Sequence, residues 1–529
     1  MVITAKRLLT RANRGQTTSN AAILISFAYL LSLVLGLLRN RLLVAHFGLG
    51  ADLSAYNAAF RLPDLLFTLL VSGAFAVSFI PVLTKYLQED DRETAWLVTS
   101  SLLNLLSLGT ILGGVLIIIF AGPLTTLITP GFNPATHQLA VGLTRIMAVT
   151  PIFFAMSSVL GSVQQSFNRF VMFASAGILY NVGIILGIIF FTGRFGIYGA
   201  AFGVIIGVIL QALVQWLGLF GLGFKYHFIF SFKLAGVRKA LKLLFPRSID
   251  QGIDQINYSV ETIIGSTISI SAIGQFSLAN SLKNVPLVLI GSSITTAVFP
   301  RLAARAASGA REHLIEGYVQ TAKLLLFLAI PSALFCWVAR GYIVRLLYGF
   351  GDTATANTLG WFAGTIIFSS LFMLVSRIFF AMQDTKTPLY TSLGSIPLNI
   401  VLSIILARRF GVSGLAMSAS FVAALETIVL AGILRHREGN FGERQITIAG
   451  LKMFVAGMIM SWATYYLITN VIPLYESDHG FIILASKFLA ILIVATVTYL
   501  VPCFLLRIGE AKTVTDKLWL LMQRSLGLT

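Results

Sequence analysis

Two short rows of polar side chains stand inside otherwise apolar segments, each at helical spacing. The first row consists of Asn57, Arg61, Asp64 and Thr68. Positions i, i+4, i+7 and i+11 share one face of a helix. Ionised groups inside a membrane are costly unless they are partnered, so they tend to line the path of a polar substrate. The first row therefore predicts one wall of a cationic, water-filled cavity.

Arg39 and Arg41 lie in the preceding apolar segment, 21–47, and extend the same predicted wall. Long basic side chains near a helix end can instead reach back to the membrane surface, and this alternative stays open for both arginines. Arg61 and Asp64, at i and i+3, could also form a private ion pair beside the bend at Pro63. The pattern alone does not choose between these roles.

The second row lies in the apolar segment 240–272 and has the same spacing. It consists of Asp250, Asp254, Asn257 and Glu261. Carboxylate and amide oxygens suit a hard cation or a proton relay, and secondary transporters place coupling-ion sites in such helices. The row therefore predicts a site for a coupling cation, sodium or a proton. The alternative is a wet cavity lining that binds nothing, with Asp250 paired to Arg247 at the interface.

Composition identifies an integral membrane protein. Of 529 residues, 57% are hydrophobic and only 11% are charged, with a mean hydropathy of +0.88. The net charge of +18 falls mostly in short connections, which is typical of topology signals and not of nucleic-acid binding. The two cysteines and six scattered histidines support neither a disulfide framework nor a metal site. No P-loop or catalytic motif is present, so we expect a transporter without cofactor or catalytic residues.

About fourteen apolar segments are long enough to cross a bilayer, so the fold class expected is an all-α polytopic membrane protein. If the N-terminus is cytoplasmic, the inner connections carry most of the lysine and arginine, including the cluster from Lys225 to Arg247. The outer connections hold only Arg194, Arg340, Arg345, Arg408 and Arg409. The charge bias predicts that both termini are cytoplasmic.

An internal repeat divides the chain. Residues 195–201 (FGIYGAA) are echoed by 410–416 (FGVSGLA), and 79–81 (FIP) by 298–300 (VFP), at an offset of about 215 to 219 residues. The offset predicts two six-helix bundles around a central cavity, followed by an additional helix pair. The predicted parts are a basic N-terminus (1–20), an N-lobe (21–222), a basic linker (223–247), a C-lobe (240–437), the helix pair (445–507) and a cytoplasmic tail (508–529).

A series of motifs along the whole chain resembles one family. It consists of Gly36, Arg39, 47–48 (FG), 60–65 (FRLPDL), 73–75 (GAF), 79–81 (FIP), 130–132 (PGF), 168–169 (NR), 286–302 and 384–388 (DTKTP). In this order the motifs are similar to those of the MurJ (MviN) family of lipid II flippases. That resemblance implies the multidrug/oligosaccharidyl-lipid/polysaccharide exporter fold and translocation of the undecaprenyl-diphosphate-linked peptidoglycan precursor to the outer leaflet of a bacterial inner membrane.

The chain departs from the family pattern at several cavity positions. Family members commonly carry arginine at the positions of Leu33, Phe67 and Ser281, and an acid at Asn40 and at or near Ser54. Arg39 is the clearest match to the family's cationic set. Lys283, together with Arg41 and Arg61, could supply replacement charge for a diphosphate. Arg169, Asp384 and Lys386 fall in short turns, where we expect structural or gate pairing.

The resulting functional hypothesis is a monomeric lipid II flippase working by alternating access, biased by a coupling cation or the membrane potential. Its expected partners are lipid II, membrane lipids and cell-wall synthesis proteins. Two alternatives stay open. A relative of the same fold could export another polyprenyl-linked oligosaccharide or drugs, and a scaffold of cell-wall synthesis would transport nothing, leaving both polar rows without a role.

Overall fold

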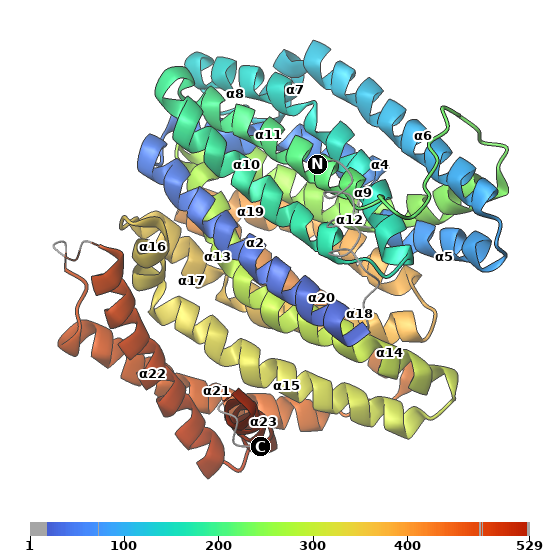
Figure 1. Cartoon of the computed structure of the whole chain (residues 1–529). Coiled ribbons are helices and arrows are strands. Elements are labelled where there is room, and N and C mark those ends of the chain that lie inside the picture. The colour runs from blue at the N-terminus through green and yellow to red at the C-terminus, as the bar shows by residue number, and fades with distance from the viewer. Residues whose placement is uncertain (1–17, 72–73, 476–477, 479, 526–529) are drawn as a thin grey trace. The chain divides into compact units, whose positions relative to one another are not determined.

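The computed structural model describes residues 18–71, 74–475, 478 and 480–525, and every regular element in this part of the chain is helical (Figure 1). The basic N-terminus expected over 1–20 lies almost wholly outside the described residues. The chain divides into two compact units, Met1–Gly274 and Gln275–Thr529. The all-helical class predicted from composition is therefore confirmed.

Unit 1 contains eleven complete helices among its described residues. They are α2 (Thr18–Phe47), α3 (Ala51–Ala59), α4 (Arg61–Leu70), α5 (Ala74–Gln88), α6 (Arg92–Ile119), α7 (Ala121–Ile128), α8 (Pro134–Met147), α9 (Thr150–Ser166), α10 (Val171–Phe195), α11 (Ile197–Leu217) and α12 (Ala235–Ile268). Helix α12 packs against α4 and α5 and so belongs to this compact unit. Its place in the second six-helix repeat rests on the sequence offset alone and stays a prediction.

Unit 2 begins within α13 (Ala272–Pro286), which continues through a π-helical turn, Leu287–Ser292, into α14 (Ser293–Ala307). The helices that follow are α15 (Arg311–Val338), α16 (Arg340–Tyr348), α17 (Thr353–Trp361), α18 (Ala363–Ala381), α19 (Lys386–Phe410), α20 (Val412–Glu438), α21 (Glu443–Tyr466), a second π-helical turn (Leu467–Val471), α22 (Phe481–Leu505) and α23 (Gly509–Ser525). The appended pair α21 and α22 packs together, and α21 also packs on α15.

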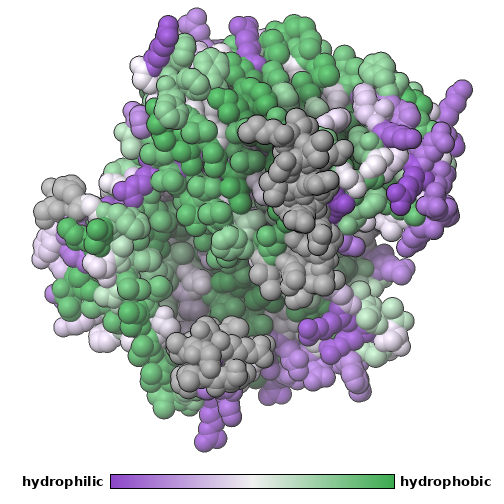
Figure 2. Space-filling view, viewed as in Figure 1, coloured by the Kyte–Doolittle hydropathy of each residue, from purple (hydrophilic) through white to green (hydrophobic). Residues whose placement is uncertain are grey.

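Twelve helical stretches in the described chain are long and apolar enough to cross a membrane. The two expected segments missing from this set, 53–86 and 240–272, are helical but carry the polar rows. Figure 2 shows a surface that is largely apolar, with hydrophilic residues gathered toward its edges. The segment 53–86 is missing because it is divided into helices of 9, 10 and 15 residues, whereas 240–272 belongs to a long helix whose polar row lowers its hydropathy.

The segment expected as one helix over 53–86 is three helices. Its first break is at Phe60, between α3 and α4. Pro63 has no N–H to donate to the carbonyl of Ala59, so the regular bonding cannot continue across this point. The row Asn57, Arg61, Asp64 therefore spans two short helices and not one continuous face.

The internal repeat is visible in the backbone of two helical hairpins, α10–α11 and α19–α20. Gly196 (φ 56°, ψ −140°) joins the first pair and Gly411 (φ 58°, ψ −139°) joins the second. The turns that precede the hairpins also match, with positive φ at Asn168 (55°) and Gln383 (63°). Both pairs are separated by 215 residues. This conformation is readily accessible to glycine, which explains why the FG dipeptide recurs at the joint.

Each unit has its own apolar core. In unit 1 the tightly buried residues include Phe75, Phe79 and Trp96, which join α5 and α6. In unit 2 one core lies around α15 and α18 and another around α15, α21 and α22. These cores fix the helices from which the candidate site residues project.

Candidate functional site

Arg39, on α2, is oriented by two side-chain amides. Its Nε and Nη2 donate to Oδ1 of Asn40 at 3.2 and 3.0 Å, and its Nη1 donates to Oδ1 of Asn181 at 3.3 Å. Asn181 is fixed in turn, because its Nδ2 lies 3.1 Å from the carbonyl and hydroxyl oxygens of Ser32 and from the carbonyl of Gly177. All the acceptors named for Arg39 are neutral, so they hold the guanidinium in place without cancelling its charge.

Two tyrosines are influenced by the charge of this guanidinium. Tyr56 on α3 and Tyr180 on α10 both interact electrostatically with Arg39. The Tyr56 hydroxyl is buried and has no hydrogen-bond partner in the described chain. The Tyr180 ring packs against Phe154 with 5.5 Å between ring centroids. Unit 1 thus combines a cation with two hydroxyl groups and aromatic walls.

Arg61, in the first row, contacts the helix that carries the second row. Its guanidinium lies 3.7 Å from the centroid of the Tyr258 ring, so α4 meets α12 at this point. Asp64, on the same helix, interacts electrostatically with Arg61. The Arg61 side chain is only 5% exposed, and its Nε has no hydrogen-bond partner among the described residues. A desolvated cation–π contact contributes about 2 kcal/mol to stability, so this contact helps hold α12 against α4 within unit 1.

The candidate coupling row divides between two environments. Asp254 is exposed and Asn257 half-buried, whereas Glu261 is only 9% exposed. The side chain of Asp250 lies outside the described residues. Further along α12, the Ser266 hydroxyl accepts a hydrogen bond from the Gly131 amide at 3.1 Å, so this part of the helix is covered by the α7–α8 turn. Among described residues no group of three or more His, Cys, Asp or Glu could hold a metal ion.

The remaining predicted cavity residues, Asn57, Arg41 and Lys283, lie on three different helices. Asn57 donates to the carbonyl of Leu53 at 2.9 Å, within its own helix. Arg41 is half-buried on α2. Lys283 belongs to unit 2, where its ammonium lies 4.7 Å from the centroid of Phe362. The structure thus connects Arg39 with Asn40 and Asn181, and Arg61 with Tyr258 and Asp64.

Positions where the chain departs from the family pattern have clear local roles. Asn40 supplies the oxygen that receives Arg39. The Ser54 hydroxyl accepts from the Gly274 amide at 3.3 Å, and Phe67 packs on Phe154 with 5.3 Å between centroids. A neutral amide and an aromatic contact therefore stand where charges were expected.

Arg169 closes the base of the hairpin α10–α11. Its Nη1 and Nη2 donate to the carbonyls of Phe220 and Gly221, just beyond α11, at 3.0 and 3.4 Å. The turn before α10 is thereby tied to the chain that leaves α11. The structural or gate role expected for Arg169 stays a prediction.

Asp384 closes the base of the hairpin α19–α20. Its Oδ1 accepts from the amides of Lys386 and Thr387 at 3.0 Å, and its Oδ2 accepts from the Thr387 hydroxyl at 2.6 Å and from Nη1 of Arg437 at 2.8 Å. Burial acts to raise the pKa of Asp384, but the hydrogen bonds from Thr387, Arg437 and the Lys386 amide outweigh it and lower the pKa below its ordinary value. The Lys386 side chain is exposed.

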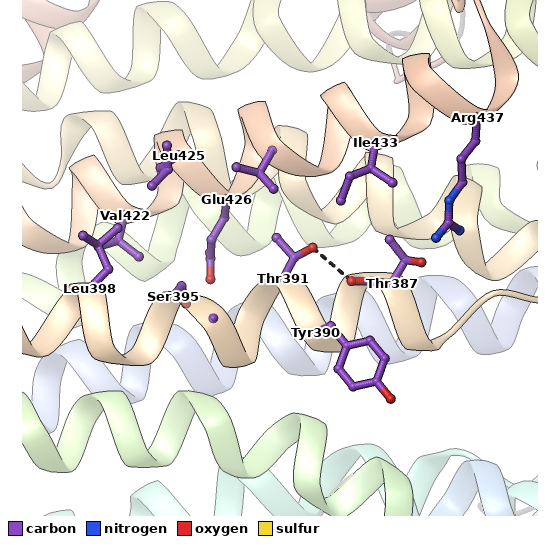
Figure 3. Close-up of a pocket in the computed structure, with 12 residues that line it drawn as sticks. Thr387, Tyr390, Thr391, Ser395, Leu398, Val422, Leu425, Glu426, Ile433 and Arg437 are labelled. Carbon is purple, nitrogen blue, oxygen red and sulfur yellow. Dashed lines mark hydrogen bonds between the residues drawn. The ribbon is translucent and has the colours of Figure 1, made fainter.

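A pocket of about 470 Å³ lies between α19 and α20 (Figure 3). Figure 3 shows Glu426 directed from α20 toward α19 near Ser395, with Arg437 at the far end beside Thr387. The lining combines hydroxyl and aliphatic groups: Thr387, Tyr390, Thr391, Gly394, Ser395, Leu398, Val422, Leu425, Glu426, Val429, Ile433 and Arg437. Glu426 was not predicted from the sequence, although it is the single acidic residue in the apolar run 412–434.

Comparison with known proteins decides the family. The sequence profile of the family described as "Lipid II flippase MurJ" matches residues 43–485. The chain belongs to this family. It is 27% identical over 472 residues to a probable lipid II flippase MurJ of Borreliella burgdorferi, covering 87% of this chain and 91% of the relative. It is 26% identical over 432 residues to the lipid II flippase MurJ of Burkholderia cenocepacia, covering 79% and 84%.

Solved structures support the same fold. A structure described as lipid II flippase MurJ in an inward closed conformation matches with a TM-score of 0.75 at 24% identity, over 92% of this chain and 99% of that one. An inward-facing multidrug resistance transporter of the MATE family matches with a TM-score of 0.63 at 15% identity, over 81% and 98%. These likenesses show the fold, and membership of the MurJ family makes the protein a polytopic membrane transporter.

Proposed function

We propose that this protein is a lipid II flippase that moves the undecaprenyl-diphosphate-linked peptidoglycan precursor between leaflets of the bacterial cytoplasmic membrane by alternating access. The observation that carries the proposal is the Arg39 centre, where a guanidinium is held by the neutral oxygens of Asn40 and Asn181. A diphosphate requires cationic partners within a low-dielectric path, and a guanidinium offers two parallel donors. The family membership supports lipid II as the substrate.

The direction of transport rests on the proposed topology. The charge bias of the connections supports cytoplasmic termini, with substrate entering from the cytoplasmic leaflet and leaving at the outer one. We take the working form to be a monomer that meets cell-wall synthesis proteins after release. Single-cysteine labelling tests this topology: Ala51→Cys and Asn133→Cys should react from outside, and Glu89→Cys only after permeabilisation.

Coupling to a cation is the second part of the proposal. Asp254 and Glu261 are the candidate carboxylates, supported by their position on the α12 helix that Arg61 contacts through Tyr258. An inside-negative potential contributes about 2.3 kcal/mol per charge per 100 mV, enough to bias the return of an empty carrier. Asp254→Asn and Glu261→Gln should slow turnover and reduce its dependence on sodium or pH. Parental rates and ion dependence in both variants would contradict this coupling.

The deciding experiment is rescue of cells depleted of their own lipid II flippase. The parent should restore growth, Arg39→Ala should fail at equal membrane levels, and Arg39→Lys should rescue partly because a point charge replaces a two-donor fork. Arg194→Ala, a matched control in the α10–α11 hairpin, should rescue fully. Failure of the parent despite correct insertion would favour another polyprenyl-linked substrate, and full rescue by Arg39→Ala would remove the charge argument.

A further inference from the structure

The chain between α11 and α12 contains a segment without regular secondary structure, residues 225–233, that we call the aromatic strap. Its side chains alternate in exposure. Tyr226, Phe228, Phe230 and Phe232 are 46%, 80%, 45% and 62% exposed, whereas the intervening His227, Ile229 and Ser231 are half-buried. The three phenylalanine rings form the exposed aromatic face of the strap.

The other face of the strap is bonded to α6. The His227 amide donates to the Ser100 hydroxyl at 3.1 Å, and the Ser231 amide donates to the Ser101 hydroxyl at 2.9 Å. The Asn104 side-chain amide donates to the carbonyls of His227 and Ile229 at 3.2 and 3.0 Å, and its oxygen accepts from the Tyr226 hydroxyl at 2.8 Å. Side chains of α6 thus satisfy the strap backbone, which fixes the direction of the aromatic face.

The strap continues a surface of α6 that faces lipid. Exposed apolar residues run along α6 at the spacing of one helical face, through Leu108, Leu112, Val115 and Ile119. Continuing the same face toward the start of the helix leads to Asn104, Ser101 and Ser100, which are buried beneath the strap. About 20 helical residues cover the roughly 30 Å hydrocarbon core, so a helix crossing that ends near Ile119 begins near Ser100. The strap therefore lies at the edge of the membrane core.

Cationic side chains accompany the aromatic face. Lys225 and Lys233 bound the strap, and Arg238, Lys239 and Lys242 follow on the first turns of α12; all five are exposed. Aromatic rings partition to the membrane–water interface, and clustered lysine and arginine beside a membrane attract anionic headgroups. In water, the three exposed phenylalanine rings would form an aggregation-prone apolar patch.

From these contacts we propose that the aromatic strap is a binding surface for anionic phospholipids of the leaflet at the Arg92 end of α6, which is the cytoplasmic leaflet in the topology proposed above. The rings of Phe228, Phe230 and Phe232 insert below the headgroups. Lys225 and Lys233 contact lipid phosphates. This surface is separate from the Arg39 centre and serves attachment of the linker, not recognition of the transported lipid.

The depth of the strap can be measured with nitroxide spin labels on the full chain in lipid vesicles. Phe228→Cys is labelled in a background carrying Cys336→Ser and Cys503→Ser, with Leu112→Cys as the lipid-core control and Glu89→Cys as the aqueous control. At Phe228 the ratio of oxygen to nickel-complex accessibility should lie clearly above that at Glu89. Because the vesicles contain only this protein, a value equal to that at Glu89 would overturn the proposal and leave a protein partner as the explanation of the patch.

The lipid class is tested by comparing phosphatidylglycerol with phosphatidylcholine vesicles. The thermal midpoint of the parent, which needs no cysteine changes, should be higher in phosphatidylglycerol. In Lys225→Gln/Lys233→Gln and in Phe228→Ser/Phe230→Ser/Phe232→Ser this lipid-dependent difference should fall to half or less. Flippase rescue by these variants should persist, which separates this surface from substrate transport. Equal midpoints of the parent in both lipids, or an unchanged difference in both variants, would overturn the assignment.

Discussion

The hairpins α10–α11 and α19–α20 are two copies of one design with different interiors. Both turn at a glycine with nearly the same backbone angles. In both, a second glycine three residues after the turn, Gly199 or Gly414, lies against the backbone of the opposite helix. Beyond the turn the copies diverge. In the first, Gly183 meets Gly207 and Gly187 meets Gly203, so the two backbones touch. In the second, the helices enclose the pocket of Figure 3.

The 215-residue offset explains this divergence residue by residue. Gly183 and Gly207 correspond to Leu398 and Val422, and both of these larger residues line the pocket. Small residues allow close helix packing in membranes. The two helices of the first hairpin are therefore in direct backbone contact. Those of the second are further apart at these positions, and the Glu426 side chain lies between them.

The bases of the two hairpins are closed by opposite charges at equivalent positions. Arg169 donates to backbone carbonyls beyond α11, while Asp384, 215 residues later, accepts from Arg437 near the end of α20. The position thus keeps its function as a clasp although the sign of its charge is inverted. Only the second clasp contains a group that titrates in the acid range.

The largest loss of stability is expected when Gly207 in the first hairpin is replaced by valine, the residue at the equivalent position 422 of the second. A Cβ at Gly207 would lie 2.5 Å from the carbonyl oxygen of Tyr180, so Gly207→Val must push the two backbones apart. We expect a loss of about 3 kcal/mol in the free energy of unfolding and a lower yield of folded protein. The measurement is unfolding in detergent.

The matched change is Val422→Gly, which removes a pocket-lining side chain in the second hairpin. Its cost should be about 2 kcal/mol, from the helix penalty of glycine and the loss of a side chain that is only 6% exposed, and so smaller than that of Gly207→Val. Equal losses in the two variants would show that the hairpins do not differ in packing.

A smaller effect is expected from exchanging the polar residues at the next equivalent pair, Gln211 and Glu426. The Gln211 side-chain amide donates to the Ser157 hydroxyl at 3.0 Å, and a carboxylate cannot make that donation. Gln211→Glu should lower stability by about 2 kcal/mol, because an acidic group within the membrane is costly. Glu426→Gln should cost below about 1 kcal/mol, and the reverse order would mean that the pocket depends on its negative charge.

The smallest effect is the pH dependence of the second clasp. The pKa of Asp384 is lowered in the folded protein, so its contribution is fully present above the ordinary value of about 3.9 and is lost as pH falls through the folded value. Below that pH, the protection of the Lys386 and Thr387 amides against hydrogen exchange, taken relative to the intrinsic exchange rate at each pH, should fall. Asp384→Asn should show the lower protection at every pH, while the protection of amides around Arg169 should not change over the same range. Protection in the parent that does not vary with pH would contradict this clasp.

Sequence reasoning predicted the architecture because length and hydropathy alone define membrane helices. It also predicted the repeat, since Gly196 and Gly411 are constrained by the same turn. It could not predict that Tyr258 would lie over Arg61, because helical spacing assigns a residue to a face and not to a neighbour. Asn181 was missed for the same reason, since it is 142 residues from Arg39 and stands alone in an apolar run.

The pocket beside Glu426 was missed for a different reason. A cavity depends on the side-chain volumes of two facing helices, and no single residue in 386–438 indicates it. The comparison with the first hairpin supplies the signal in retrospect, because glycine in one repeat and Leu398 or Val422 in the other indicates unequal helix separation.

The attachment of the strap has a mechanical consequence for α12. Ser231 is bonded to Ser101, and α12 begins at Ala235, so only Phe232, Lys233 and Leu234 are left between this fixed point and the helix. Three residues reach at most about 11 Å when fully extended. The first turn of α12 can therefore tilt about this point but cannot move away from it, so any larger displacement of α12 must occur toward its far end, near Ile268.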